Sequence, residues 1–494
     1  ISFMKAASTQ QAQGAQDAVA DQLYALIAEH KKDYSRQDVL NQFIELGMGA
    51  KRYDIVEDYL ASFINMGAKV PALYHLIAVA QERQPNMPKA IASIRNCFQA
   101  NGPKTESMYE AAGRILCRGD LNDLDLCRKL LEQGFNEYQR NSEIFLLLAE
   151  VYQMLGRHEE LLPLYKQAIT TNPFNHTFHF VLGLVTMITS NLTSGFEPYK
   201  HRFLLPSFKD NTAYVPWPEW QGEPLQGKKI YIRAEQGVGD ILMWAGLIPW
   251  VQQQGADITL SVPARMMVLF ERSFPSIKIV DKHLVLPTEE LLTHFEYYSP
   301  LGNLMQYALP HYKPAEHAPY LIPDKDAVAK KRAEYLAHNP KAKKLVGISW
   351  HSTAVTGWRR NIPLEAMSPL LQDPEAVYIS LQYNQQLDDV DDYNKNHDQE
   401  IIPDLSFIAV DDIDMWATQH AAMDEVYSIQ NSTVHLAGGL GVPTTIFLQP
   451  YGSFHWGNGR NPNPWYKSVT ICQQKVGRKW DAVIKDYARS LKKK

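Results

Sequence analysis

A change in hydrophobic periodicity near residue 205 limits the fold of this 494-residue chain more than any other feature. Before it, glycine and proline are sparse and apolar residues recur every three or four positions, which is typical of amphipathic helices. After it, short apolar runs alternate with loops and helical segments, which predicts parallel sheets covered by helices. A chain of this length is expected to form two or three domains, so we interpret the change as a domain boundary.

The clearest helical unit spans residues 142–173. Its small residues Ala149 and Ala168 allow two predicted helices to approach closely, and weaker copies are centred near Ala78 and Ala112. The pattern resembles the tetratricopeptide repeat, which has a period of about 34 residues. Such repeats stack into an array whose concave face binds a partner. A plain helical bundle is the alternative.

The sequence predicts an α plus α/β architecture in which tetratricopeptide-like helical repeats precede two Rossmann-like lobes. The expected domains are a repeat domain at 1–205, a linker at 206–224, a first lobe at 225–340 and a second lobe at 341–494. Strands are predicted at 229–233, 258–262, 277–280, 345–350, 377–381, 425–429 and 444–448. The terminal amphipathic helix, 480–491, either crosses back to the first lobe or closes the second.

The loop after the first predicted strand carries Gly237, Gly239 and Asp240. Two glycines let the backbone approach a ligand, and the following helix start offers N–H groups to an anion. Asp240 has two interpretations. It is either a helix-capping acid or a general base that removes a proton from an acceptor hydroxyl.

A second loop follows the first strand of the second lobe and contains Ser349, Thr353, Arg359 and Arg360. Hydroxyl groups and paired guanidinium groups suit a diphosphate, because guanidinium matches phosphate oxygens in a bidentate way. A solvated arginine pair is the alternative.

A third loop carries Ser432, Thr433 and His435 at the start of a helix that follows a strand. Either hydroxyl can cap that helix, whose N-terminus is a phosphate site. His435 is either structural or functional.

Together these motifs, in the order 237–240, 349–364, 380–382 and 432–443, resemble the lipopolysaccharide heptosyltransferase family, and the resemblance extends over about residues 140–490. The resemblance implies a GT-B fold with an inverting transferase that needs no metal or other cofactor. Its substrate would be a nucleotide-diphosphate sugar.

The resemblance also implies functions for individual residues. Asp240 would be the catalytic acid, and Gln382 would position the nucleoside. The donor and its phosphates would be bound by Gly237, Gly239, Ser349, Thr353, Arg359, Arg360, Gln382, Ser432, Thr433 and His435. Gln430 and Asn431 stand where the family has Asp-Thr, at the positions that meet the donor sugar. This departure implies either a different donor or lost activity.

Composition limits the classes of partner. The net charge of -5 argues against a nucleic-acid ligand. Four cysteines without a C-x-x-C pair, no bilayer-spanning segment and no signal peptide predict a cytoplasmic protein. The expected partners are a nucleotide sugar and a protein acceptor, such as flagellin, or a glycan, bound through the repeats. The alternatives are a non-catalytic repeat scaffold and a nucleotide-sugar epimerase.

Overall fold

The computed structural model describes residues 17–84, 86–190, 192–211, 215–283, 294–354, 357–384, 386–450, 453–457 and 463–492. The chain divides into two compact units. The first contains the described residues up to 155 together with 166–172, and the second contains 156–165 and everything from 173 onward. Each unit is described separately below.

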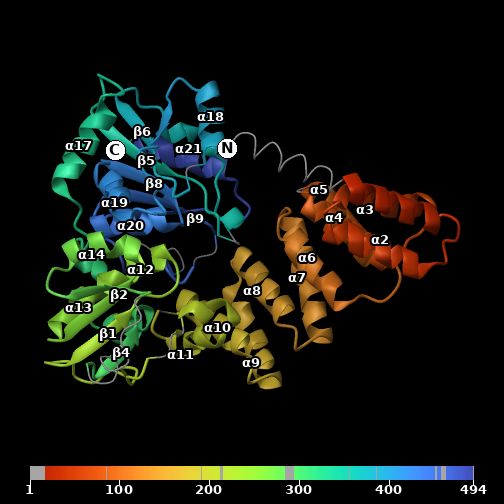
Figure 1. Ribbon diagram of the computed structural model, residues 1–494, viewed down its shortest axis with the longest axis horizontal. Helices are drawn as coiled ribbons and strands as arrows, with labels where there is room; N and C mark the ends of the chain where they lie inside the picture. Colours follow the sequence, from red (N-terminus) through yellow and green to blue (C-terminus); the bar gives the residue numbers. More distant parts are fainter. Residues whose placement is uncertain are drawn as a thin grey trace. The chain divides into compact units, whose positions relative to one another are not determined.

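The first unit consists of helices, in which each helix packs beside the next one along the chain (Figure 1). Helices α4 and α6, and α6 and α8, also contact one another, so alternate helices form a layer. The bounds are α2 Gln37–Gly49, α3 Tyr53–Asn65, α4 Pro71–Arg83, α5 Met87–Gln99, α6 Glu106–Leu116, α7 Leu121–Glu137 and α8 Ser142–Met154. Helices α2, α4, α6 and α8 start at residues 37, 71, 106 and 142, which are 34 to 36 residues apart. The predicted helical repeats are therefore confirmed, with the period of tetratricopeptide units.

Small residues set the distance between these helices, as expected from the sequence. Ala78 and Ala112 are fully buried. A Cβ added at Gly113 would lie 2.7 Å from Leu147 Cδ1, so no larger residue fits between α6 and α8 without a shift. Packing this dense penalises changes of even one methylene group.

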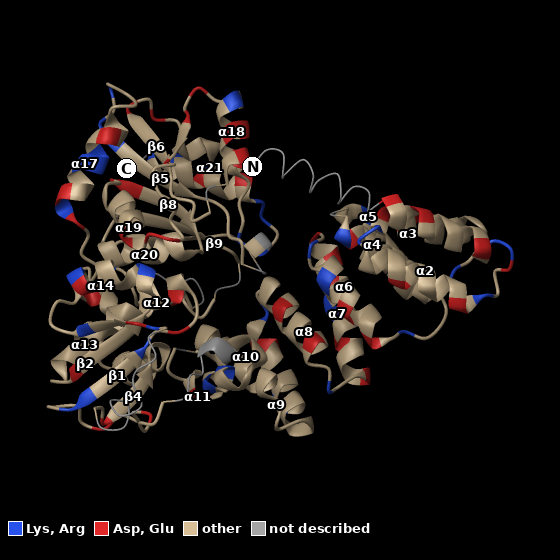
Figure 2. Ribbon diagram, in the orientation of Figure 1, with Lys and Arg blue, Asp and Glu red and all other residues tan. Residues whose placement is uncertain are grey.

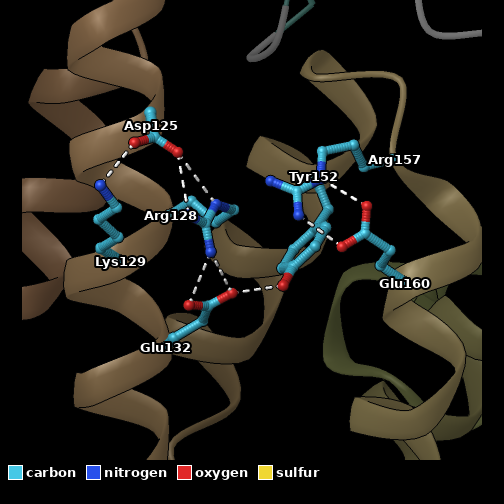
Figure 3. A network of polar contacts seen from close by, with 7 residues as sticks. All are labelled: Asp125, Arg128, Lys129, Glu132, Tyr152, Arg157 and Glu160. Atoms are coloured by element: carbon cyan, nitrogen blue, oxygen red, sulfur yellow. Dashed lines mark hydrogen bonds and ion pairs between the residues drawn. The ribbon is translucent and has the colours of Figure 1, made fainter.

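A polar network joins α7 to α8 (Figure 3). Arg128 donates to Glu132 at 2.8 Å and to Asp125 at 2.9 Å, and the hydroxyl of Tyr152 donates to Glu132. Burial, followed by the bond to Glu132, raises the pKa of Tyr152 to about 12. The carboxylate of Glu132 thus accepts from both helices.

The second unit begins with helices that pack against its α/β part. The elements are α10 His176–Thr189, α11 Phe196–Tyr199 and the 3-10 helix η2 Lys200–Leu204. Met187, Phe196 and Tyr199 share one hydrophobic core with Ile230 and Ile232 of the first sheet. The division into two compact units falls between residues 155 and 173, earlier than 205. It does not test the domain limits expected at 205, 224 and 340, which stay predictions.

The first lobe contains a parallel sheet in the order β3-β2-β1-β4. Its strands are β1 Lys229–Arg233, β2 Asp257–Val262, β3 Lys278–Asp281 and β4 Tyr297–Pro300, and its main helices are α12 Val238–Trp244, α13 Ile248–Gln253, α14 Met267–Ser273 and α16 Leu304–Ala308. The expected linker pairs with this sheet, because the amide of Trp220 donates to the carbonyl of Tyr298 at 2.8 Å. Strand β4 was absent from the prediction.

The second lobe contains a parallel sheet in the order β10-β9-β8-β5-β6-β7. Its strands are β5 Lys344–Ser349, β6 Ala376–Ser380, β7 Ile401–Pro403, β8 Glu425–Ile429, β9 Thr444–Leu448 and β10 Val469–Gln473, and its helices are α17 Lys325–Leu336, α18 Leu387–Asn396, α19 Ile413–Ala421, α20 Ser432–Leu440 and α21 Trp480–Leu491. Both signs of charge are interspersed along α17 (Figure 2). The expected two-lobed α/β architecture is therefore confirmed.

The lobes meet through α12 and α20, which lie side by side (Figure 1). Arg272 of the first lobe and Asp414 of the second form an ion pair at 2.6 Å across the same junction. Helix α21 packs on the second lobe, where the hydroxyls of Tyr487 and Thr445 are 2.8 Å apart. The terminal helix therefore closes the second lobe, which was one of the two expected arrangements.

Candidate active site

Asp240 lies in the first turn of α12, at the carboxyl end of β1. Its Oδ2 accepts a hydrogen bond of 3.1 Å from the amide of Gly237, the exposed residue that precedes the helix. This contact satisfies an amide that the helix itself leaves without a partner. The capping function expected of Asp240 is thus present, and it uses only one of the two carboxylate oxygens.

The other oxygen of Asp240 faces the second lobe. Oδ1 is 2.7 Å from Nε2 of His455, which belongs to the described loop segment 453–457. Burial alone would raise the pKa of Asp240, but the hydrogen bond from His455, together with that from the Gly237 amide, holds it below the usual value. Asp240 is therefore an anion at neutral pH and is held between the lobes.

Close backbone packing brings this carboxylate to the start of α20. A Cβ added at Gly239 would lie 3.1 Å from His435 Cδ2 and 3.2 Å from Ser432 Oγ. Glycine at 239 thus allows the N-terminal turns of α12 and α20 to approach. Behind them, a Cβ at Gly438 would lie 2.5 Å from the ring of Tyr466, so α20 is closely packed on both sides.

His435 is buried beside the pair formed by Asp240 and His455. Its Nδ1 is 3.0 Å from the hydroxyl of Tyr466, and its ring stacks on Trp456 at a centroid distance of 5.3 Å. Burial, followed by the nearby His455, lowers the pKa of His435 to about 3. The imidazole is therefore neutral at physiological pH. A contact between His435 and an anionic ligand would be a hydrogen bond and not an ion pair.

Arg360 supplies a cation close to this set. Its Nη1 donates to the carbonyl of Gln430 at 3.2 Å, and its charge helps to lower the pKa of His435 after burial and His455. Arg359 is half-buried at the end of a short 3-10 helix, and Thr353 is exposed. Residues 355 and 356 of the same predicted anion loop lie outside the described residues.

Four of the predicted site residues form a polar cluster, in which Ser349, Gln382 and Thr433 are buried and Asn431 is half-buried. Oε1 of Gln382 accepts from the hydroxyl of Ser349 at 2.8 Å and from the amide of Trp350 at 2.8 Å. Asn431 donates to the Ser349 hydroxyl at 2.6 Å and accepts from the amide of Thr433 at 3.2 Å, which caps α20. These side chains hold the loops in place, and their expected contacts with a donor stay predictions.

The structure therefore separates the predicted residues into two groups. Asp240, Gly239, Ser432, His435 and Arg360 converge where the lobes meet, with Gly237 at the start of α12. The side chains of a second group are hydrogen-bonded to other protein groups: Ser349, Gln382, Asn431 and Thr433.

Sequence analysis missed His455, which makes the closest polar contact to Asp240. It stands in the segment Ser453-Phe454-His455-Trp456, which has neither helical nor strand periodicity and lies outside the motifs at 237–240, 349–364, 380–382 and 432–443. The only signal was an aromatic cluster shortly after a strand, at the sheet edge where ligands bind in α/β folds.

Sequence analysis also missed two residues from the helical segment that precedes the first sheet, which consists of α10, α11 and η2 (residues 176–204). Arg202 is fully buried, and its Nη2 donates at 2.6 Å both to Glu235, which precedes the glycine loop, and to Asn303. Tyr199 accepts a hydrogen bond of 2.7 Å from the side chain of Gln236. The ring of Tyr199 also lies 5.5 Å from that of Phe454, next to His455. The segment thus supports site loops of both lobes.

None of the helices in the described segments is long and apolar enough to cross a membrane. Nor do these segments bring three or more His, Cys, Asp or Glu side chains together in a way that could hold a metal ion.

No protein-family model matches the chain. It is 26% identical over 435 residues to Protein FlbA of Caulobacter vibrioides, a match that covers 82% of this chain and 70% of that protein. Among solved structures it is similar to the glycosyl transferase family 9 protein of Veillonella parvula, at 12% identity over 55% of this chain and 91% of that one, with a TM-score of 0.40. It is also similar to E. coli heptosyltransferase WaaC with ADP, at 12% identity over 54% and 98% of the two chains, with a TM-score of 0.36. The tetratricopeptide-repeat protein YrrB matches at 11% identity over 37% and 93%, with a TM-score of 0.31.

Proposed function

We propose that this chain is an inverting glycosyltransferase that needs no metal and transfers a sugar from a nucleotide-diphosphate donor to an acceptor hydroxyl. One observation supports the proposal above others. The anionic Asp240 of the first lobe meets the first turn of α20 in the second lobe, with Arg360 close by. A base and an anion-binding set from opposite lobes are what such a transfer requires.

In the proposed reaction the acceptor oxygen attacks the anomeric carbon while its proton passes to the Asp240 carboxylate. The bond between that carbon and the diphosphate oxygen breaks, and the electron pair leaves with the nucleoside diphosphate. Negative charge grows on the leaving group, and the helix start at Ser432 and the Arg359–Arg360 pair would stabilise it. Neutral His435 would add a hydrogen bond.

We propose a protein acceptor, such as flagellin, rather than a lipid-linked glycan, and a cytoplasmic reaction. The support is the stack of paired helices in the first unit, since such arrays bind extended partners along one face. A non-catalytic scaffold is the second candidate. One observation favours it: the Gln430 and Asn431 side chains, expected at the donor sugar, are bonded to Ser453 and Ser349.

The test uses the full chain, a panel of nucleotide-diphosphate sugars and an extract of its own host. We expect one donor to add a sugar mass to a macromolecule in the presence of EDTA. Turnover of the donor without any acceptor would identify an epimerase instead. Stabilisation against heat by one nucleoside diphosphate should accompany transfer, by mass action. If every nucleotide leaves the melting temperature unchanged and no donor reacts, the scaffold is correct.

Substitution of the base sharpens this test. Asp240→Asn should lower kcat by at least about 100-fold, because it removes the base but keeps a side-chain acceptor for the Gly237 amide. Stabilisation by the nucleoside diphosphate should remain. Asp324→Asn is the matched control, because Asp324 also caps a helix, α17, away from the site. Normal turnover by Asp240→Asn would show that Asp240 is only a cap.

A further inference from the structure

A chain of hydrogen bonds runs behind Asp240 through the second lobe. Nε2 of Gln430 is 2.6 Å from the hydroxyl oxygen of Ser453, which is 3.2 Å from Nδ1 of His455. Nε2 of His455 is in turn 2.7 Å from Oδ1 of Asp240. Gln430 is 6% exposed, so the end of this hydrogen-bond network that lies farthest from Asp240 is shielded from solvent.

The chemistry of the groups determines which atom donates and which accepts in each of these hydrogen bonds. The anionic Asp240 carboxylate can only accept, so Nε2 of His455 carries a proton and donates it. In a neutral imidazole this leaves Nδ1 without a proton, as an acceptor. An amide nitrogen can only donate, so Ser453 accepts from Gln430 and has its own proton available for Nδ1.

The backbone at His455 is fixed as well. Its carbonyl accepts a hydrogen bond of 2.7 Å from the indole of Trp465, which is buried. The amide of Trp465 donates in turn to Asn463 at 3.0 Å. Phe454, the preceding residue, packs against Tyr199. The backbone that carries the His455 ring is thus held by Trp465 and, through Phe454, by Tyr199.

We propose that His455 is a positioning residue for Asp240 in the transfer reaction, and that Gln430 and Ser453 fix its tautomer. This inference rests on the proposed function and assigns to Gln430 a task other than contact with the donor sugar. His455 orients one carboxylate oxygen while the Gly237 amide orients the other. Because His455 and Asp240 come from different lobes, the base is in place only when the lobes are together.

Two substitutions of His455 separate positioning from packing. His455→Leu removes the donor to Asp240, and we expect kcat to fall about 30-fold with the donor KM within about twofold of the original. His455→Gln keeps an N–H group at nearly the same distance along the side chain, and we expect kcat within about fivefold. A purely structural function would make both variants melt earlier and would not favour glutamine over leucine.

The pH profile of kcat tests this assignment of donors and acceptors. The titratable and charged groups around His455 are Asp240 and His435, with Arg360 beyond them. In Gln430→Glu, a carboxylate would accept from Ser453 and favour a proton on Nδ1 of His455. The resulting imidazolium would stabilise the Asp240 carboxylate and make it a weaker base, so the acid limb of kcat should move to lower pH, by about one unit. Gln430→Met, which cannot accept, should not move it.

A measurement without turnover keeps the two proposals separate. In protein labelled with 15N-histidine, one imidazole signal should be lost in His455→Gln, and at pH 8 its shifts should show a proton on Nε2 and none on Nδ1. A proton on Nδ1 overturns the inference alone, as does normal kcat in His455→Leu. Failure of the wild-type chain to use any donor overturns the proposed function and this inference together.

Discussion

The side-chain amide of Gln236 donates a hydrogen bond to the hydroxyl of Tyr199 across 2.7 Å. Gln236 has a φ of 62°, in the left-handed region that residues other than glycine rarely adopt. It stands directly before Gly237, so its conformation sets the direction in which the chain enters α12 and presents Asp240. The end of the helical segment is therefore part of the frame of the candidate site, and strain at Gln236 is maintained by a contact from outside the lobe.

Tyr199→Phe should lower kcat about fivefold, because one hydrogen bond to a strained loop is worth roughly 1 kcal/mol. The ring remains, so its contacts with Phe454 and the core are kept. The measurement is a comparison of kcat and donor KM with those of the original chain. Tyr307→Phe is the control, since its exposed hydroxyl makes one weak contact of 3.4 Å with Gln221. Equal kcat in both variants would contradict the prediction.

The buried ion pair between Arg202 and Glu235 gives a second prediction, about stability. The two side chains are 0% and 2% exposed, and the amide of Gly302 also donates to Glu235. Arg202→Met leaves a buried carboxylate without its cation, which costs about 3–5 kcal/mol. We expect the melting temperature of the second unit to fall by roughly 10 °C.

The double variant Arg202→Met with Glu235→Gln should recover most of that loss, because glutamine is neutral and still accepts from Gly302. Lys343→Met is the control. It breaks an exposed ion pair with Glu375, which is worth about 1 kcal/mol or less. A double variant that melts as low as the single one would show that the loss comes from packing of the arginine stem rather than from charge.

Much of the fold followed from hydrophobic periodicity. Strands with continuous apolar runs, such as Lys344–Ser349 and Thr444–Leu448, were predicted to within one residue, because a buried parallel strand needs that pattern. Strands β4, β7 and β10 were missed. They are short, and all three lie at a sheet edge, where one side needs no apolar partner.

The candidate site was only half predictable, for a related reason. Asp240 and Ser432 follow strands in order, so the rule that ligands meet the carboxyl ends of strands placed them together. His455, Tyr199 and Arg202 reach the site through tertiary packing between segments distant in sequence. No local sequence pattern indicates such a contact. A single sequence likewise could not show that the Gln382 side chain is used within the protein.

Arg359 and Arg360 give a third prediction, about donor affinity. Replacing both by alanine should raise the donor KM at least about tenfold, because guanidinium–phosphate contacts are charge-assisted and would be lost. The heat stabilisation by nucleoside diphosphate should shrink in parallel. Arg478→Ala with Arg489→Ala is the matched control, because both side chains pair with Asp486 on the exposed surface of the second lobe. Unchanged donor affinity in the first variant would remove the arginine pair from the site.

Buried histidines give a fourth prediction, about the pH dependence of stability. His420 is fully buried; its Nδ1 donates to the carbonyl of Trp416 at 2.8 Å, and its Nε2 has no hydrogen-bond partner in the segments that the structure describes. Burial lowers the pKa of His420 to about 4. The unfolded chain, with an ordinary histidine pKa near 6.5, therefore binds more protons than the folded one as the pH falls below that value. Folding stability should drop by roughly 1.4 kcal/mol for each pH unit between about 6.5 and 4 for this one side chain.

His420→Leu should flatten that slope, because leucine fills the same space and cannot titrate. The measurement is the melting temperature between pH 7 and pH 5, where the wild-type chain should fall further than the variant by about 3 °C or more. His435, whose pKa burial and His455 lower to about 3, titrates in the same direction, so some slope should remain in His420→Leu. His338→Leu is the control, because that residue follows α17 at the surface and its change should leave the slope intact. A variant at position 420 that keeps the full slope would mean that the acid sensitivity of the fold originates elsewhere, with His435 beside Asp240 as the next group to replace.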